Sequence, residues 1–545
     1  MKSIEGNIVD ILNRKIYPAE IRISSNGEIS EICPNSKKYD QYICPGFIDA
    51  HVHIESSMLT PCEFSKTVIQ KGTIAVITDP HEIANVLGKK GIQFMIDDSR
   101  RAVIKIYFGI PSCVPATPYD SAGHSISAED VQELAESGNF ILLSEMMNVP
   151  GVIHKDQDVI AKLEIAQKYG LFIDGHAPLL RGDDLTHYIQ QGISTDHESS
   201  TIEEALEKIS KGMKILIREG SAAKNYEALK SLIKTNPDDI MFCTDDSHPD
   251  DLIWKGHIDK IVKKAITDGF DLFDVLQIAC LNPVWHYKLD TGLLEKGQKA
   301  DFVIFRNLQS FDVLSVYIDG IEKYNNEYFH TYNAISAIKY DTNNLNKFNH
   351  QFISLNNLKK KADEKNLCIG IISDEIVTKK SYFTIKEPVE NLESDLEQDI
   401  LKIVYINRYN NGTPQLAFIH GFGLKKGAFA STISHDSHNI IAIGTNDHDL
   451  KDAVNAIIAS KGGLVVSNGG ETDILSLPIG GIMTDETAEQ TALKYQFLNN
   501  RLKEMGCKPE SPFMTLSFMS LIVIPELKIG EKGLFDFNSF FSSDQ

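Results

Sequence analysis

Two histidines, His51 and His53, end the apolar segment PGFIDAHVH and are placed to bind one metal ion together. Side chains alternate between the two faces of a strand, so residues two apart point the same way. Three later apolar segments end in side chains of the same ligand type, namely His176, His197 and Asp245. For any one of these residues alone, a role in the core or in a loop is the simpler interpretation. As a set, however, imidazoles with a carboxylate are suitable ligands for Zn²⁺, Fe²⁺ or Mn²⁺. Together they predict a metal site, provided that the fold brings the segment ends together.

The elements that must position these residues are short apolar runs separated by helix-length amphipathic segments, which is the pattern of repeated βα units. Eight such runs over roughly 250 residues indicate a TIM barrel, whose active site forms at the C-terminal ends of its strands. Nearly all of the runs end in polar or ionisable residues, as a catalytic face requires. The runs cover residues 43–53, 73–79, 103–110, 140–146, 170–176, 192–198, 213–219 and 240–246.

Two segments outside these runs alternate apolar and polar residues around tight-turn dipeptides, Asn26-Gly27 in IRISSNGEISEI and Asp319-Gly320 in VLSVYIDGIEKY. One predicted hairpin precedes the barrel and the other follows it, so we expect one small β-domain built from both ends of the barrel. Strand-like LCIGIISDEIV, KIVYINRYNNGTPQLAFIHG and GLVVSN, with the helical AVNAIIAS, come later in the chain. The sequence thus predicts an α/β protein with three parts: a split β-sandwich domain at 1–44 and 287–340, a (β/α)8 barrel at 45–286, and a C-terminal α+β domain at 341–545.

Composition excludes several classes of partner. The chain has 545 residues with 54 Lys and Arg against 75 Asp and Glu, a formal charge of −21, which disfavours nucleic acid. The most apolar run spans residues 513–524 and contains Ser and Thr, whereas a membrane span needs about 20 apolar residues. Eight cysteines are scattered without a CxxC pair, as in reduced thiols. We therefore expect a cytoplasmic protein with no secretory signal and no membrane span.

Eight segments carry a more specific signal. They are PGFIDAHVHIESS, TDPHEIANV, FGIPSCVPAT, DGHAP, TDHES, REGSAAKN, TDDSHPDDL and the C-terminal GFGLKKGAFASTISHDSHNIIAIGTN. Together they resemble the adenine deaminases of the amidohydrolase superfamily. The resemblance runs from about Pro45 to the end of the chain. It implies hydrolytic deamination of adenine to hypoxanthine and ammonia by a metal-activated hydroxide, in purine salvage or adenine catabolism. It also implies two divalent metal ions per chain, with Mn²⁺ or Fe²⁺ favoured and Zn²⁺ possible.

The resemblance implies a particular set of metal ligands. Many members of the superfamily bridge two metals with a modified lysine at the end of strand 4, but that strand reads FILLSEMMN and offers Glu145 instead. A buried carboxylate without a partner is costly, so we assign Glu145 as the bridging ligand in preference to a hydrogen-bonding role. The implied centre has His51 and His53 on one ion, His176 and His197 on the other, and Asp245 beside the first.

The same resemblance suggests residues for proton transfer. Asp245, at the barrel mouth, is the candidate to accept a proton as hydroxide attacks C6 and to pass it on. Glu82 or His81, in the DPHE motif, are the candidates to protonate the ring nitrogen next to C6. A helix cap or a loop salt bridge is the alternative for both.

Two further groups are candidate substrate ligands. Arg218 and Ser221, in REGSAAKN, could hold the purine edge or orient a neighbouring side chain. His435, Asp436 and His438, in HDSH, could close over the barrel mouth, bind a metal of their own or pack the domain interface.

Two other functions are compatible with the residues. One is an amidohydrolase that acts on a cyclic amide such as a dihydropyrimidine or hydantoin. The other is a metal-free barrel with a binding role, which the complete ligand set disfavours. A homodimer is the default expectation for a soluble enzyme of this kind.

Overall fold

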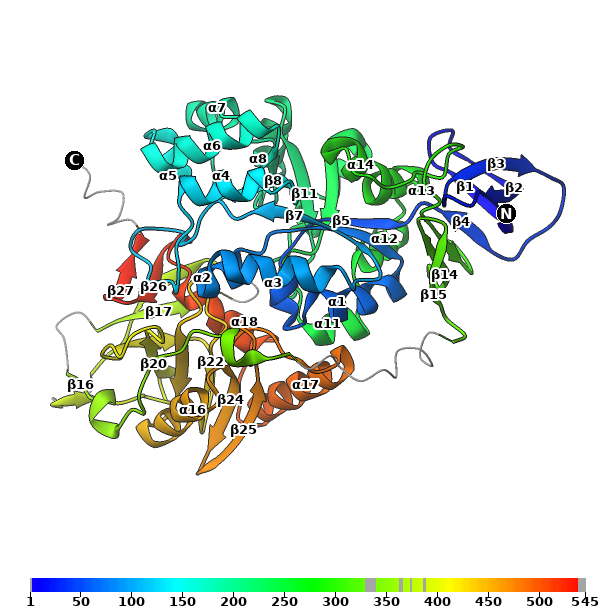
Figure 1. Cartoon of the computed structure of the whole chain (residues 1–545). Coiled ribbons are helices and arrows are strands. Elements are labelled where there is room, and N and C mark those ends of the chain that lie inside the picture. Colours follow the sequence, from blue (N-terminus) through cyan, green and yellow to red (C-terminus); the bar gives the residue numbers. More distant parts are fainter. Residues whose placement is uncertain (1, 329–339, 362–365, 373–374, 386–388, 538–545) are drawn as a thin grey trace.

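The computed structural model has a barrel at its centre, a small sheet at one end and a larger α+β unit packed against the barrel mouth (Figure 1). The structure describes residues 2–328, 340–361, 366–372, 375–385 and 389–537. Within these ranges no helix is long and apolar enough to cross a lipid bilayer. All eight cysteines are free thiols, and all but Cys33 are buried.

Parallel strands close into a complete barrel in the middle of the chain. Five of them pair in sequence order and three more pair in a second sheet. The two sheets meet on one side through the Ser194 amide, which donates to the Ile173 carbonyl at 2.9 Å. On the other side, a parallel bridge joins Val52 to Asp245 and closes the ring. The strands are β5 (Phe47–Val52), β6 (Thr73–Thr78), β7 (Lys105–Ile110), β8 (Phe140–Met146), β9 (Phe172–Gly175), β10 (Thr195–Asp196), β11 (Lys214–Arg218) and β12 (Ile240–Cys243).

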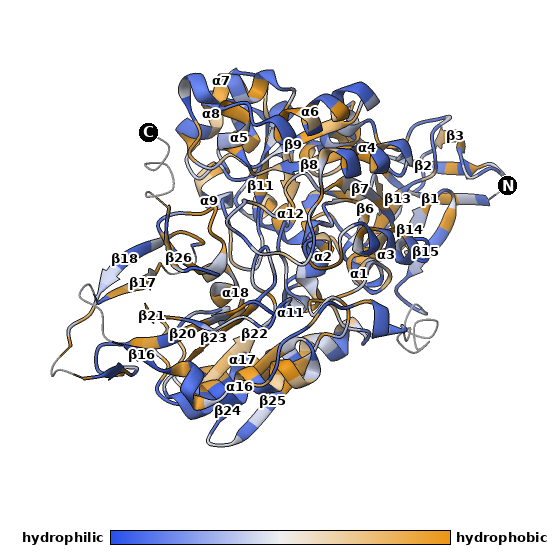
Figure 2. Ribbon diagram, turned by 60° about the vertical axis from the view of Figure 1, so that its left-hand side comes forward, coloured by the Kyte–Doolittle hydropathy of each residue, from blue (hydrophilic) through white to orange (hydrophobic). Residues whose placement is uncertain are grey.

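Helices surround this barrel, and each predicted run contains one of its strands, so the prediction of a TIM barrel is confirmed. The outer helices carry both hydrophilic and hydrophobic segments, as surface helices that pack one face on a core must (Figure 2). They are α1 (Pro61–Val68), α2 (His81–Leu87), α3 (Lys89–Ser99), α4 (Ala128–Glu136), α5 (Val149–Ile153), α6 (Gln157–Tyr169), α7 (Gly182–Gln190), α8 (Ile202–Ser210), α9 (Tyr226–Leu229), α10 (Leu232–Thr235), α11 (Pro249–Trp254), α12 (Ile258–Thr267), α13 (Leu272–Leu276) and α14 (Asn282–Tyr287).

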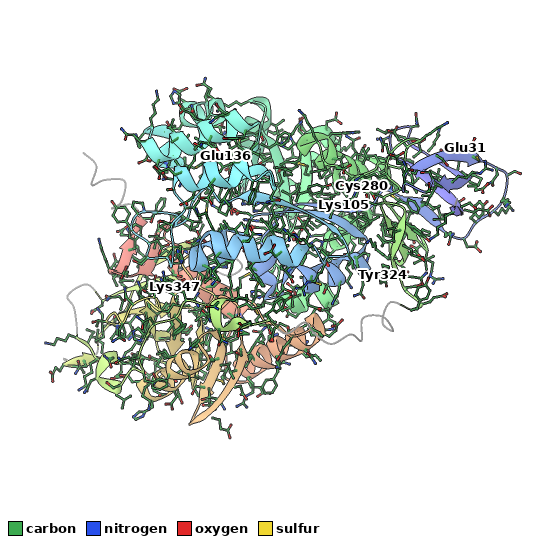
Figure 3. All side chains as sticks on the ribbon, in the orientation of Figure 1. Glu31, Lys105, Glu136, Cys280, Tyr324 and Lys347 are labelled. Carbon is green, nitrogen blue, oxygen red and sulfur yellow. The ribbon has the colours of Figure 1, made fainter. Side chains whose placement is uncertain are left out.

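A sheet at the far end of the barrel combines strands from both of its flanks in the order β15-β14-β13-β4-β1-β2-β3. Both expected hairpins are present in it, β2 with β3 and β14 with β15. Lys105 at the start of β7 lies where the barrel meets this sheet (Figure 3), and its Nζ lies 2.6 Å from the buried carboxylate of Asp301. The strands are β1 (Lys2–Asp10), β2 (Lys15–Ile23), β3 (Ile29–Pro34), β4 (Tyr42–Cys44), β13 (Phe302–Phe305), β14 (Val313–Ile318) and β15 (Ile321–Asn325).

The C-terminal region forms a mostly antiparallel sheet in the order β18-β17-β21-β20-β23-β22-β24-β25. Its expected strands and helix are present, although residues 373–374 of LCIGIISDEIV lie outside the described ranges. The elements are β16 (Lys360–Lys361), β17 (Leu367–Ile371), β18 (Thr378–Tyr382), β19 (Asn391–Leu392), β20 (Ile400–Ile406), β21 (Gln415–His420), β22 (Ala428–Ser431), β23 (Ile440–Gly444), α16 (Asp447–Ser460), β24 (Gly463–Asn468), β25 (Glu471–Ser476), α17 (Ala488–Glu504), α18 (Pro512–Ser517), β26 (Leu527–Gly530) and β27 (Gly533–Asp536).

Hydrogen bonds attach this C-terminal unit to the loops at the barrel mouth. The Lys347 ammonium, labelled in Figure 3, donates to the carbonyl of Gly123. The Asn439 side chain donates to the carbonyl of Ser121 at 2.9 Å. Because both acceptors lie in the segment after β7, the C-terminal unit covers the face at which the barrel strands end.

Candidate active site

The carboxylate of Glu145 lies at the centre of the barrel mouth, between two pairs of histidines. Its Oε1 is 3.1 Å from Nε2 of His53 and 3.9 Å from Nε2 of His51. Its Oε2 is 2.8 Å from Nδ1 of His176 and 3.2 Å from Nε2 of His197. Burial by itself would raise the pKa of Glu145, but the surrounding histidines outweigh it and hold the pKa well below the usual range. Each oxygen therefore serves one histidine pair, which is the arrangement a bridging ligand requires.

The first histidine pair shares its side of the site with Asp245. Nε2 of His51 and Nε2 of His53 are 3.2 Å apart, and Oδ1 of Asp245 is 3.5 and 3.1 Å from them. The carbonyl oxygen of Asp79 lies 3.0 Å from Nδ1 of His53, which favours the ring proton at Nδ1 and leaves Nε2 able to bind a metal. Asp245 has a φ of 56°, an uncommon conformation for a non-glycine residue, at the point where β12 meets β5.

Arg218 neutralises the other side of Asp245. Its guanidinium bonds to Oδ2 of Asp245 and to the carboxylate of Glu198. Burial raises the pKa of Asp245, but the Arg218 charge outweighs it and holds this pKa well below the ordinary value. Arg218 also lines the cavity at the barrel mouth, together with these two carboxylates.

Glu198 was not singled out from the sequence, although it follows His197 directly. Its Oε1 is 3.4 Å from Nε2 of His197 and 3.7 Å from Nδ1 of His176. Its position in the TDHES motif was the only signal that could have found it. The second histidine pair thus has a carboxylate beside it, as the first pair has Asp245.

Glu82 is held by two histidines from the C-terminal unit. Nδ1 of His435 is 2.6 Å from its Oε1, and Nε2 of His438 bonds its Oε2. Burial would raise the pKa of Glu82, but the two imidazoles hold it well below the usual range. The pKa of His435 is raised to about 9 because the Glu82 charge outweighs the effect of burial. The part of the C-terminal unit that covers the cavity, which includes the HDSH motif, is called the roof of the site. The contact between Glu82 and the HDSH motif is buried and attaches this roof to the barrel.

His81 differs from Glu82, because one of its ring nitrogens is still able to bind a ligand. Its Nδ1 is 3.0 Å from Oδ2 of Asp79, while its buried Nε2 has no hydrogen-bond partner among the described residues. The nearest carboxylates to that Nε2 are Oε1 of Glu82 at 3.6 Å and Oδ1 of Asp436 at 3.9 Å. Asp436 also keeps one buried oxygen without a partner. Both groups line the cavity and are available to a ligand.

Ser221 lies outside the lining of this cavity. Its hydroxyl donates to Asp251 at 2.7 Å and accepts from the backbone amide of His248 at 2.8 Å. His438 also lies outside the lining, behind Glu82. The structure thus brings together all the other predicted site residues around one cavity or in its ligand cluster: His51, His53, His81, Glu82, Glu145, His176, His197, Arg218, Asp245, His435 and Asp436.

A buried lysine outside the cavity fixes the loops that carry the second histidine pair. Nζ of Lys208 on α8 donates to the Ala177 carbonyl at 2.7 Å and to Oδ2 of Asp196 at 2.8 Å. The other oxygen of Asp196 accepts from the Ala177 amide at 2.9 Å. Ala177 follows His176 and Asp196 precedes His197, so this ion pair sets the spacing between the two ligands. Glu204 adds a second carboxylate at 2.8 Å from the ammonium.

The donor set fits divalent metal ions. Overlapping groups of buried imidazole and carboxylate atoms lie within 4.8 Å of one another around Glu145. Nε2 of His176 is buried without a partner. Carboxylates and imidazole nitrogens that converge in this way satisfy the ligand chemistry of Zn²⁺, Mn²⁺ or Fe²⁺. The buried clusters could therefore hold metal, as the sequence predicts.

Comparison with known families agrees with this site. Residues 42–322 match the model of the amidohydrolase family, and residues 375–541 match the adenine deaminase C-terminal domain. An adenine deaminase of Methanosarcina mazei is 47% identical over 99% of this chain and 98% of its own length. The adenine deaminases of Methanosarcina acetivorans and Borreliella burgdorferi are 48% and 46% identical, with 99% and 98% of this chain and 98% of each relative covered.

The barrel, its buried ligand cluster and the first of these matches define an amidohydrolase. The adenine deaminase relatives align with nearly the full length of this chain, including both the barrel and the C-terminal region. The chain belongs to the adenine deaminase family, and the resemblance drawn from its motifs is confirmed.

Replacing Glu145 tests the central carboxylate. Glu145→Gln removes the charge that faces both histidine pairs, so we expect the affinity for metal at both to fall by at least about tenfold. Metal content after gel filtration, measured by plasma mass spectrometry, should drop with no change in the circular dichroism spectrum. Glu136→Gln on the outer surface of α4 is the matched control and should keep the full metal content. A Glu145→Gln protein that retains all of its metal would contradict the bridging assignment.

Replacing Lys208 should affect only one half of the centre. Lys208→Met removes the ion pair that sets the spacing of His176 and His197, and changes to such supporting residues weaken metal binding by about 10–100-fold. We expect titration of the apo-protein to show one weakened metal site and one unchanged site. Lys208→Arg should restore part of the loss, and Lys234→Met, an exposed lysine, should have no effect. Equal weakening of both sites would show that Lys208 supports the barrel in general.

Proposed function

We propose that this protein catalyses the hydrolysis of adenine to hypoxanthine and ammonia. The observation that carries the proposal is the Glu145 carboxylate between two histidine pairs, in a chain that aligns end to end with adenine deaminases. The family comparisons do not favour a cyclic amide such as a dihydropyrimidine or hydantoin. A metal-free binding role is also disfavoured. Burying several carboxylates and imidazoles at one point is costly, and a bound metal would offset that cost.

Two divalent cations per chain would reduce the excess of negative charge at the site. Six carboxylates line the cavity, and the cations that oppose them are Arg218, the His435 imidazolium and the protonated His81 that the reaction needs. The remaining excess of carboxylates favours divalent cations. We propose His51, His53 and Asp245 for one ion, His176 and His197 for the other, and Glu145 for both. We propose Mn²⁺ or Fe²⁺ as the preferred metals, with Zn²⁺ as a third possibility.

When bound, the two cations would lower the pKa of a water molecule so that hydroxide is available near neutral pH. Asp245 would accept the proton that this water gives up when its oxygen bonds to C6 of adenine. The same carboxyl group then passes the proton to the amino group, which leaves as ammonia. The hydroxyl proton that remains at C6 returns to the group that protonated the ring nitrogen, which gives hypoxanthine and restores that group. Arg218 keeps Asp245 ionised and in place for the first step.

We propose His81 as the donor to the ring nitrogen next to C6, in preference to Glu82. Both oxygens of Glu82 accept hydrogen bonds from His435 and His438, and its lowered pKa leaves it ionised. His81 is held by Asp79 at Nδ1 and presents Nε2 to the cavity without a partner. When the oxygen bonds to C6, the electrons of the double bond between C6 and that ring nitrogen move onto the nitrogen. Protonation of the nitrogen keeps it from becoming negatively charged.

The remaining residues of the HDSH motif would contact or support the substrate. Asp436 has an open buried oxygen that can accept a hydrogen bond from an N–H group of the base. His435 lines the same space and stacks on Phe518 with ring centroids 5.0 Å apart. We propose that His438 positions Glu82, and that Arg218 and Ser221 orient their neighbours.

Several broader assignments accompany this function. We propose that the enzyme serves purine salvage in the cytoplasm as a homodimer. The domain boundaries are proposed at residues 44 and 45, 286 and 287, and 340 and 341.

An assay of the metal-reconstituted protein tests the proposed reaction. Apo-protein loaded separately with Mn²⁺, Fe²⁺ or Zn²⁺ should convert adenine to hypoxanthine, followed by ultraviolet absorbance and by ammonia release. A dihydropyrimidine and a hydantoin assayed in parallel should not be opened. Asp245→Asn should lower kcat by at least about 100-fold, because the proton acceptor is lost. Fully loaded wild-type protein that is inert toward adenine would refute the proposal.

Paired variants distinguish the two candidate proton donors. His81→Gln should lower kcat by about 100-fold or more, the usual contribution of a general acid. Glu82→Gln should have a smaller effect on kcat, because it loosens the roof without removing the donor. Metal content is measured for both proteins so that loss of metal is not mistaken for loss of the donor. A His81→Gln enzyme with near-normal kcat beside an inactive, metal-loaded Glu82→Gln enzyme would reverse the assignment.

A further inference from the structure

The space directly at the ligand cluster is too small for a purine. The cavity there has a volume of about 40 Å³. A single water molecule needs about 10–15 Å³ on the same measure, so this space holds only a few waters. Its walls are mostly charged side chains, with apolar contributions from Met147, Phe518 and Leu521. The two fused rings of adenine must therefore occupy additional space while C6 lies at the cluster.

The roof of this cavity is fixed to the barrel. The additional space for adenine is therefore not available above the cluster unless the roof moves. Both imidazoles that bond Glu82 belong to the roof. Lys528, which is fully buried, donates to the carbonyls of Ile376 at 2.7 Å and Phe518 at 3.0 Å. Ile376 and Phe518 are themselves roof residues. Lifting the roof would break the buried contacts of His435 and His438 with Glu82 and expose the apolar interior around Phe518.

A second cavity adjoins the first at the level of the cluster. This side cavity has a volume of about 390 Å³ and shares Met147 and His176 with the space at the metal ligands. Its wall comes from the segments after β7, β8 and β9, from the segment before β26, and from β27 with the residue that follows it. The apolar side chains that form most of this wall include Ala116, Val149, Pro150, Leu180 and Val523.

The side cavity also contains the polar groups that a base requires. Thr117, Asn148 and Asp184 are part of its lining. Oδ1 of Asn148 accepts from the amide of Gly151 at 2.9 Å, which leaves its NH₂ group as a donor for a ring nitrogen. Small-molecule sites are typically apolar cavities with a few well-placed polar groups of this kind. The end of the PSCVPAT motif, which the catalytic roles do not explain, lies in this wall.

We propose that the side cavity binds the ring system of the base and is its route to the metal ligands. This inference rests on the proposed function, because it takes adenine as the occupant. The amino-bearing edge of the base passes Met147 and His176 to reach the cluster, and the rest of the ring stays between the apolar walls. Val149 and Leu180 then determine which bases fit, through the shape of the cavity and not through charge.

Filling the side cavity tests this assignment. Val149→Trp places a large ring in the proposed path, so the KM for adenine should rise by at least about tenfold with metal content unchanged. Leu12→Trp is the matched control, because Leu12 lines a separate cavity of about 190 Å³ beside the split sheet. It should leave KM and kcat as in the wild type. Val149→Trp with wild-type KM and kcat would overturn the proposal and show that the base enters after the roof opens.

A smaller change protects the test against misfolding. Val149→Ala keeps the backbone of α5 and removes only apolar contact, so KM should rise a few-fold while kcat stays within about twofold. If Val149→Trp loses metal or helical signal, the Val149→Ala result decides, and an unchanged KM overturns the proposal. Failure of the proposed function is distinguishable, because wild-type protein would then be inert toward adenine.

Discussion

The rest of the structure depends on the burial of several carboxylates at one point. A carboxylate transferred from water to a protein interior is strongly destabilised unless positive charge or hydrogen bonds compensate for it. Glu145 is compensated by four histidines, Asp245 by Arg218, and Glu82 by His435 and His438. The first two sets of partners come from other barrel strands, so closing the barrel is a condition for the site. The partners of Glu82 come from the C-terminal unit, so docking of that unit is a condition as well.

A second level of buried charge holds the ligands in register. Lys208 and Asp196 connect the loops that carry His176 and His197. On the opposite side of the barrel, Asp49 accepts from the Thr244 amide at 3.1 Å and lies 2.9 Å from Nε2 of His257. Thr244 precedes Asp245, and Asp49 lies two residues before His51 on the same face of β5. Buried polar residues thus hold the backbone next to four of the site residues, namely His51, His176, His197 and Asp245.

The barrel and most of the cluster could be predicted from sequence because their signals are local. Each apolar run of a βα unit ends where a parallel strand ends, so the sequence alone places His51, His53, His176 and His197 at one edge of the barrel. Contacts between distant segments leave no such signal. Glu82 and His438 are 356 positions apart in the chain, and only the folded structure shows that they bond. In the sequence, Lys208 looks like an ordinary polar residue of an amphipathic helix. The side cavity is formed by loops, and amino-acid composition does not predict the shape of loops.

The charge balance of the site also constrains the substrate. Cations that neutralise the carboxylates leave no excess positive charge in the cavity, so an anionic substrate would meet no attractive field there. A neutral base pays no such penalty, and its fused rings lose little on leaving water for apolar walls. Selection among neutral bases must then come from the shape of the walls and from the few polar groups that face the ring. The buried carboxylates thus account both for a donor set that fits cations and for a site whose charge does not favour an anionic substrate.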